Sequence, residues 1–83
     1  MNNIYLIKDL AAKTGYSVET LKFYLKIKLI KEVTRGMETN FRFFDDSTVE
    51  ILKNIRTLRK EGMSIEQIRI EISKNRKGPD ELL

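Results

Sequence analysis

Apolar residues recur at helical spacing near the start of the chain and again after a glycine. The first run predicts a helix over residues 7–14, with these positions on one face: Ile7, Leu10, Ala11 and Thr14. Gly15 ends this helix, because glycine adopts the left-handed conformation that closes a helix at little cost. Ser17 then offers its hydroxyl to free backbone N–H groups, which predicts a second helix over residues 18–27.

The spacing changes from helical to strand-like after the second helix. The stretch "LIKEVT", which begins at Leu29, is rich in β-branched residues, and "FRFF" alternates an arginine with aromatic residues. Between them, "RGMETN" has the composition of a turn. We therefore expect a β-hairpin over residues 31–44 with a six-residue tip.

A third amphipathic segment follows the hairpin. Asp45 is the expected N-cap of a helix that runs to about Glu61, although Ser47 with Glu50 forms a competing capping box. The positions expected to be buried are Val49, Leu52, Ile55 and Leu58.

Gly62 separates the third helix from a fourth. Ser64 with Gln67 forms another capping box, and this helix is expected to bury Ile65, Ile68 and Ile72 before the chain breaks off at Gly78-Pro79. We expect one domain over residues 1–74 and a C-terminal tail over 75–83.

The first two helices fit a helix-turn-helix. Ala11 is small where two crossing helices approach closely, and Leu21 and Tyr24 are apolar where the second helix packs back. A helix-turn-helix followed by a hairpin is a winged helix. The predicted fold is therefore mainly α, a winged helix-turn-helix with four helices and a small β-hairpin wing.

Composition excludes most catalytic chemistry. The 83 residues contain no cysteine and no histidine, so disulfides, the usual transition-metal sites and histidine-based triads are excluded. Adjacent Asp45 and Asp46 at a helix start are typical of caps rather than of an acid/base pair. We expect no enzyme, catalytic residue, metal or cofactor. No apolar run is long enough to cross a membrane and no secretion signal is evident, so we expect a cytoplasmic protein.

Charge and aromatic residues gather in the first half of the chain. The net charge is +4, and residues 1–44 hold eight basic and four acidic side chains, whereas residues 45–83 hold eight of each. All seven aromatic residues also lie in residues 1–44. This distribution indicates a nucleic-acid partner.

The N-terminal part of the second helix is expected to enter the major groove of double-stranded DNA. Its candidate DNA-binding residues are Ser17, Glu19, Thr20, Lys22, Phe23 and Lys26. Lys22 can donate to a guanine edge or a phosphate, and Phe23 can contact a thymine methyl or the sugar backbone. The competing interpretation makes the lysines a solvated face, places Phe23 in the core and has Glu19 stabilise the helix dipole.

Four further candidate DNA-binding residues lie outside that helix: Arg35, Asn40, Arg42 and Lys60. The two arginines can reach the backbone or minor groove, unless the wing is simply solvated. Lys60 and Ser64 flank a turn whose free N–H groups can receive a phosphate, whereas ordinary helix capping is the alternative for Ser64.

Two long stretches, "IKDLAAKTGYSVETLKFYLKIKLI" and "NFRFFDDSTVEILKNIRTLRKEGMSIEQIRIEI", resemble the DNA-binding domain of MerR-type transcriptional regulators over about residues 4–72. The resemblance implies that Lys22 stands where an arginine usually contacts DNA and Phe23 where a tyrosine is usual. Asn40-Phe41-Arg42 replaces a Gly-aromatic-Arg wing sequence, which gives Arg42 a phosphate contact and requires Asn40 to supply positive φ. Leu25 and Lys28 replace a glutamate and a glycine, and two interpretations of Lys28 stay open: it adds to the basic face or it lengthens the second helix.

The resemblance implies a sequence-specific, double-stranded DNA-binding transcriptional regulator. RNA polymerase at a promoter is an expected further partner, as is a homodimer or cooperative assembly on DNA. The coiled-coil dimerisation helix and effector domain have no counterpart here, so we expect a short form, either cut from a longer regulator or a stand-alone relative. The alternatives are an excisionase-like or architectural DNA-binding factor and a protein-interaction module whose docking surface is lined by Phe23, Phe41, Phe43 and Phe44.

Overall fold

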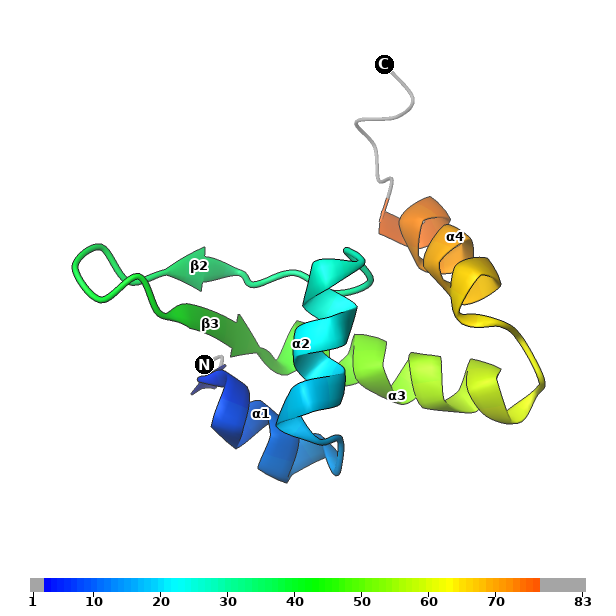
Figure 1. Ribbon diagram of the computed structural model, residues 1–83, viewed down its shortest axis with the longest axis horizontal. Coiled ribbons are helices and arrows are strands. Elements are labelled where there is room, and N and C mark those ends of the chain that lie inside the picture. The colour runs from blue at the N-terminus through cyan, green and yellow to red at the C-terminus, as the bar shows by residue number, and fades with distance from the viewer. Residues whose placement is uncertain (1–2, 77–83) are drawn as a thin grey trace, which may run out of the picture.

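The computed structural model describes residues 3–76, which form a mainly helical fold with a small sheet (Figure 1). The wing and the last helix lie on opposite sides of the second helix in this view. The elements in chain order are β1 (Ile4–Tyr5), α1 (Ile7–Thr14), α2 (Val18–Lys26), β2 (Thr34–Arg35), β3 (Arg42–Asp45), α3 (Asp46–Lys60) and α4 (Ile65–Arg76).

The helix-turn-helix forms as predicted, with α1 matching its expected bounds. Gly15 has φ 82°, and its N–H donates to the Ala11 carbonyl, which closes α1. The Ser17 hydroxyl accepts from the Thr20 N–H at 3.1 Å and so caps α2. The predicted end of α2 at residue 27 is one residue too late, because Ile27 is the C-cap.

The strand expected within "LIKEVT" is confined to the end of that stretch: Thr34 begins β2, whereas Leu29 and Ile30 lie in the turn that follows α2. Lys28 takes φ 64°, and the chain folds back over the end of the helix. The Tyr24 carbonyl accepts from the Leu29 N–H at 2.8 Å and from the Ile30 N–H at 3.4 Å. The side chains of Leu29 and Ile30 are both buried. Burial in a turn selects the same apolar residues as burial in a strand, which explains the error.

The wing is a short hairpin within a three-stranded antiparallel sheet of order β1-β3-β2. Thr34 pairs with Phe43 and Arg35 with Arg42, so Arg35 lies in a strand rather than in the predicted tip. Strand β1 was not predicted. It pairs with β3 through Tyr5 and Phe44, and the Tyr5 hydroxyl donates to Asp46 Oδ1 at 2.7 Å.

Local side-chain bonds fix the starts of α3 and α4. The Asp45 carboxylate accepts from the Ser47 N–H at 2.9 Å, so Asp45 is the N-cap, while Glu50 pairs with Lys53 instead of completing the competing box. Hydrogen bonding to the Ser47 hydroxyl and to backbone N–H groups lowers the pKa of Asp45.

The second predicted box, between Ser64 and Gln67, does form. The Gln67 side chain accepts from the Ser64 N–H at 3.2 Å, and the Ser64 hydroxyl accepts from the Gln67 N–H at 3.1 Å. The third helix ends at Lys60, one residue before its expected end, with Glu61 as its C-cap. The fourth continues to Arg76, past the boundary expected at 74, and the predicted break at Gly78-Pro79 lies outside the described residues.

The core lies where α1, α2, α3, α4 and β3 meet. Its buried apolar residues are Leu10, Leu21, Tyr24, Leu29, Ile30, Phe44, Val49, Leu52, Ile55, Ile68 and Ile72. Leu58 and Ile65, which were expected to be buried, are only partly so. Across residues 3–76 no helix has the length and apolar character that spanning a bilayer requires.

Candidate nucleic-acid interface

Helix α2 presents two different faces. Leu21 is fully buried and Tyr24 is 6% exposed, whereas Phe23 is 49% exposed and its ring lies beside that of Tyr24. Lys22 and Lys26 are also exposed. The competing interpretation placed Phe23 in the core, and the exposure of its ring shows that it does not close the core. Two lysines and a half-exposed ring form the outer face of this helix.

The first turn of α2 uses its polar groups to build the helix. Besides accepting from the Thr20 backbone, the Ser17 hydroxyl donates to Thr20 Oγ1 at 2.9 Å. Glu19 is exposed in the same turn, where a negative charge favours the positive end of the helix dipole. These three candidate residues thus have a structural role at the start of α2, next to the exposed face.

An open groove separates α2 from the wing. Its volume is about 720 Å³, and its lining comes from three segments, the start of α1, the outer face of α2 and the wing. The lining residues are Leu6, Ile7, Lys8, Lys22, Leu25, Lys26, Asn40, Phe41 and Arg42. Four of them are cationic and none is acidic. This is an apolar trough with a basic rim, which suits an anionic strand that also has apolar surface.

The groove brings together four sequence-predicted residues and adds one that sequence reasoning missed. Lys22, Lys26, Asn40 and Arg42 all line it. Lys8, in the first turn of α1, joins them. No local motif marks Lys8, since its part in the groove depends on how α1 packs beside the wing.

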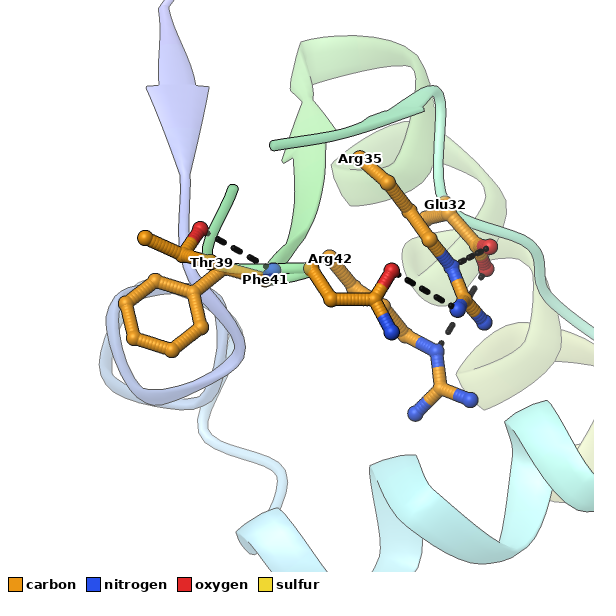
Figure 2. A network of polar contacts seen from close by, with 6 residues as sticks. Glu32, Arg35, Thr39, Phe41 and Arg42 are labelled. Carbon is orange, nitrogen blue, oxygen red and sulfur yellow. Dashed lines mark hydrogen bonds and ion pairs between the residues drawn. The ribbon is translucent and has the colours of Figure 1, made fainter. Parts of the chain in front are cut away.

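The wing arginines converge on an acidic residue, as Figure 2 shows. Arg35 Nε lies 2.9 Å from Glu32 Oε2, and Arg42 Nε lies 3.8 Å from Glu32 Oε1. The backbone N–H of Glu32 and then the Arg35 guanidinium lower the pKa of this carboxyl, so it is ionised at neutral pH. Sequence reasoning missed Glu32, although its position three residues before Arg35 was a signal.

The wing tip has the conformation expected of its asparagine. Asn40 has φ 60°, and its side-chain oxygen accepts from Arg35 Nη1 at 3.3 Å. The Thr39 hydroxyl accepts from the Phe41 N–H at 3.2 Å, which helps to hold the tip (Figure 2). Phe41 remains 53% exposed at the groove.

Lys60 lies apart from this groove. It lines a second hollow of about 330 Å³ between α1 and α3, whose other basic residues are Lys13, Lys53 and Arg56. Arg56 there donates to the Thr14 carbonyl at 3.1 Å and lies 4.6 Å from the centroid of the Tyr16 ring. Ser64 caps α4, which favours the ordinary capping role over a phosphate site.

The surface required by the protein-interaction alternative does not form. Phe44 is fully buried in the core, and Phe43 is half-buried. Only Phe23 and Phe41 of the four proposed rings are substantially exposed. The prediction of a docking surface lined by all four rings is therefore wrong.

Comparison with known proteins agrees with this geometry. The profile of the family described as "MerR HTH family regulatory protein" matches residues 5–74. The uncharacterized HTH-type transcriptional regulator YyaN of Bacillus subtilis (strain 168) is 32% identical over 65 residues, which cover 78% of this chain and 46% of that protein. The chain thus spans about half the length of this curated relative.

A solved structure extends the comparison to the fold. The crystal structure of a transcriptional regulator of the MerR family from Bacillus cereus matches with a TM-score of 0.79 and 25% identity, over 96% of this chain and 58% of that one. The predicted mainly α, winged helix-turn-helix fold is confirmed. So is the resemblance seen in the sequence: the chain belongs to the MerR family of helix-turn-helix regulatory proteins.

Proposed function

We propose that this chain is a sequence-specific, double-stranded DNA-binding transcriptional regulator. The observation that carries the proposal is the groove between α2 and the wing, where cations from three chain segments surround an apolar floor without an acidic residue. Family membership supports the same function.

The proposed complex places the N-terminal part of α2 in the major groove and the wing on the adjacent backbone. Lys22 and Phe23, on the exposed face, contact base edges or the phosphates beside them. The backbone strand between helix and wing lies in the groove, with its phosphates at Lys8, Lys26 and Arg42. Its deoxyribose rings lie against the apolar floor, which Leu25 and Phe41 help to form.

Partners and the cellular role are part of the proposal. RNA polymerase at a promoter and a second copy of the chain are the proposed macromolecular partners besides DNA. We propose a non-enzymatic role in the cytoplasm. An excisionase-like or architectural factor would instead bind in direct repeats and leave transcription unchanged, so a transcription assay separates the two roles.

The first experiment selects fragments bound from sheared genomic DNA at near-physiological salt and sequences them. We then expect Lys22→Ala to weaken binding to the recovered site by about tenfold, because one good base contact contributes roughly 1–3 kcal/mol. Binding is measured by fluorescence anisotropy and folding by thermal unfolding. Lys74→Ala, which removes an exposed lysine of α4, is the matched control. Unchanged affinity in a folded Lys22→Ala protein would contradict the assignment of α2.

A further inference from the structure

Glu32 holds an unusual position for an acidic residue beside a basic binding face. It lies in the connection between α2 and β2, and its two carboxylate oxygens divide between two guanidinium groups. The side chain of Glu32 is only 20% exposed, whereas those of Arg35 and Arg42 are 43% and 47% exposed. The Glu32 side chain is thus less exposed than the two arginine side chains that contact it, both of which remain partly accessible to solvent. Figure 2 shows how these contacts converge on the carboxylate.

The two contacts differ in strength and in what else holds each arginine. Arg35 bonds closely to Glu32 and also donates to Asn40, so it is tethered twice. Arg42 lies farther from the carboxylate, and its one ion pair within the described residues is with Glu32. Arg42 also lines the groove. It is therefore the arginine that an approaching phosphate can draw away more easily.

We propose that Glu32 is a positioning residue that acts as an internal substitute for a DNA phosphate. It competes with the DNA backbone for Arg35 and Arg42 and so lowers the affinity of the wing for DNA of any sequence. This inference rests on the proposed function and deepens it. Glu32 is placed to act through the arginines rather than by touching DNA.

The consequence for specificity follows from what phosphate contacts do. Every duplex offers the same phosphates, so such contacts strengthen specific and non-specific binding alike. When wing affinity is reduced by an internal carboxylate, the contacts of α2 with bases account for a larger share of binding. Exposed ion pairs are weak enough to be exchanged, so the wing still engages the backbone at a correct site.

The test compares two variants that remove one negative charge each from the same region. Glu32→Gln removes the carboxylate that contacts both arginines. Glu38→Gln removes an exposed carboxylate at the wing tip, for which the described part of the chain records no ion pair. Binding to an unrelated duplex of fixed sequence is measured over a range of salt concentrations, with thermal unfolding as the check on folding.

We expect Glu32→Gln to bind the unrelated duplex about fivefold more tightly than the parent, and Glu38→Gln to differ little from the parent. The slope of log K against log salt should become steeper by up to about 0.9 in Glu32→Gln, because the carboxylate no longer offsets part of the phosphate neutralisation by Arg35 and Arg42. Glu32→Asp, which keeps the charge, should retain most of the parental slope. In an Arg35→Gln/Arg42→Gln background the effect of Glu32→Gln should disappear.

Two outcomes would overturn the inference. One is an equal effect of Glu32→Gln and Glu38→Gln, which would mean that only net charge matters. The other is an effect of Glu32→Gln that persists without the two arginines. Failure of the proposed function would look different, since Lys22→Ala would then leave binding to the selected site unchanged.

Discussion

Two residues without the freedom of glycine adopt left-handed backbone conformations. Lys28 has φ 64° and Asn40 has φ 60°. Asparagine tolerates this region because its side chain bonds locally, whereas lysine has no such compensation. The strain at Lys28 lies where the chain must turn sharply to bury Leu29 and Ile30. The sequence alone left open whether Lys28 lengthens α2 or joins the basic face, and the structure shows that it does not lengthen the helix.

Lys28→Gly should therefore stabilise the protein. Relief of the left-handed strain contributes about 1–2 kcal/mol, from which the greater freedom of glycine in the unfolded chain subtracts part. We expect a net gain of about 1 kcal/mol, or a rise in Tm of roughly 4–8 °C for a domain of this size. Thermal unfolding followed by circular dichroism measures it. Lys28→Ala, which keeps a Cβ, is the control, and an equal gain in that variant would show that the lysine side chain rather than φ is responsible.

At the scale of elements, the start of α2 serves both folding and the candidate site. The Ser17 hydroxyl accepts from the Thr20 N–H, so it satisfies one backbone donor that the helix start leaves free. The same turn leads directly into the exposed Lys22 and Phe23. Loss of the cap would therefore loosen the part of α2 that is proposed to enter DNA.

Ser17→Ala should lower the free energy of unfolding by about 1 kcal/mol, the usual effect of removing such a cap. Chemical denaturation with urea measures this change. Ser17→Asn supplies another good capping side chain and should restore most of the stability. If Ser17→Asn proved as unstable as Ser17→Ala, the cap would not be the source of the effect.

Elements marked by local chemistry could be predicted from the sequence, and those made by distant contacts could not. Gly15, Ser17 and Asp45 act on residues a few positions away, so the helix ends were predicted to within about two residues. Strand β1 has two residues and exists only because β3 lies beside it, so no alternation marks it.

The same distinction applies to the candidate site. Helical spacing was enough to assign Lys22 and Lys26 to the outer face of α2. Lys8 lines the groove only because α1 packs against the wing. The spacing of residues along the sequence does not predict that packing. Glu32 belongs to a network that includes strand register, because Arg35 and Arg42 face each other across the hairpin.

At the scale of the whole molecule, basic residues line several hollows, one of which holds Lys28, Lys31, Arg35 and Arg42 beside Glu32. Lys8, Lys22, Lys26 and Arg42 line the groove between α2 and the wing. The second hollow, between α1 and α3, includes Lys60. Six of these cations face a duplex in the proposed complex: Lys8, Lys22, Lys26, Arg35, Arg42 and Lys60.

Salt dependence tests this arrangement. If about six phosphates are neutralised, log K should fall against log salt with a slope of about −5, because each neutralised phosphate releases condensed counterions. Titrations at several salt concentrations with the selected duplex measure the slope. Lys26→Ala should reduce it by about one unit, whereas Lys74→Ala should not change it. A slope near zero would contradict the electrostatic part of the proposal.

The alternation of buried and exposed positions along α2 separates two kinds of evolutionary constraint. Leu21 and Tyr24 hold the helix in the core, while Lys22 and Lys26 are exposed and Phe23 is half-exposed beside the Tyr24 ring. Substitutions at the exposed positions therefore change the free energy of unfolding little, so selection can act on them without compensating mutations elsewhere. Related proteins can therefore keep the buried residues of α2 and differ at its exposed residues. A change of target site is then accessible through a few substitutions at the surface.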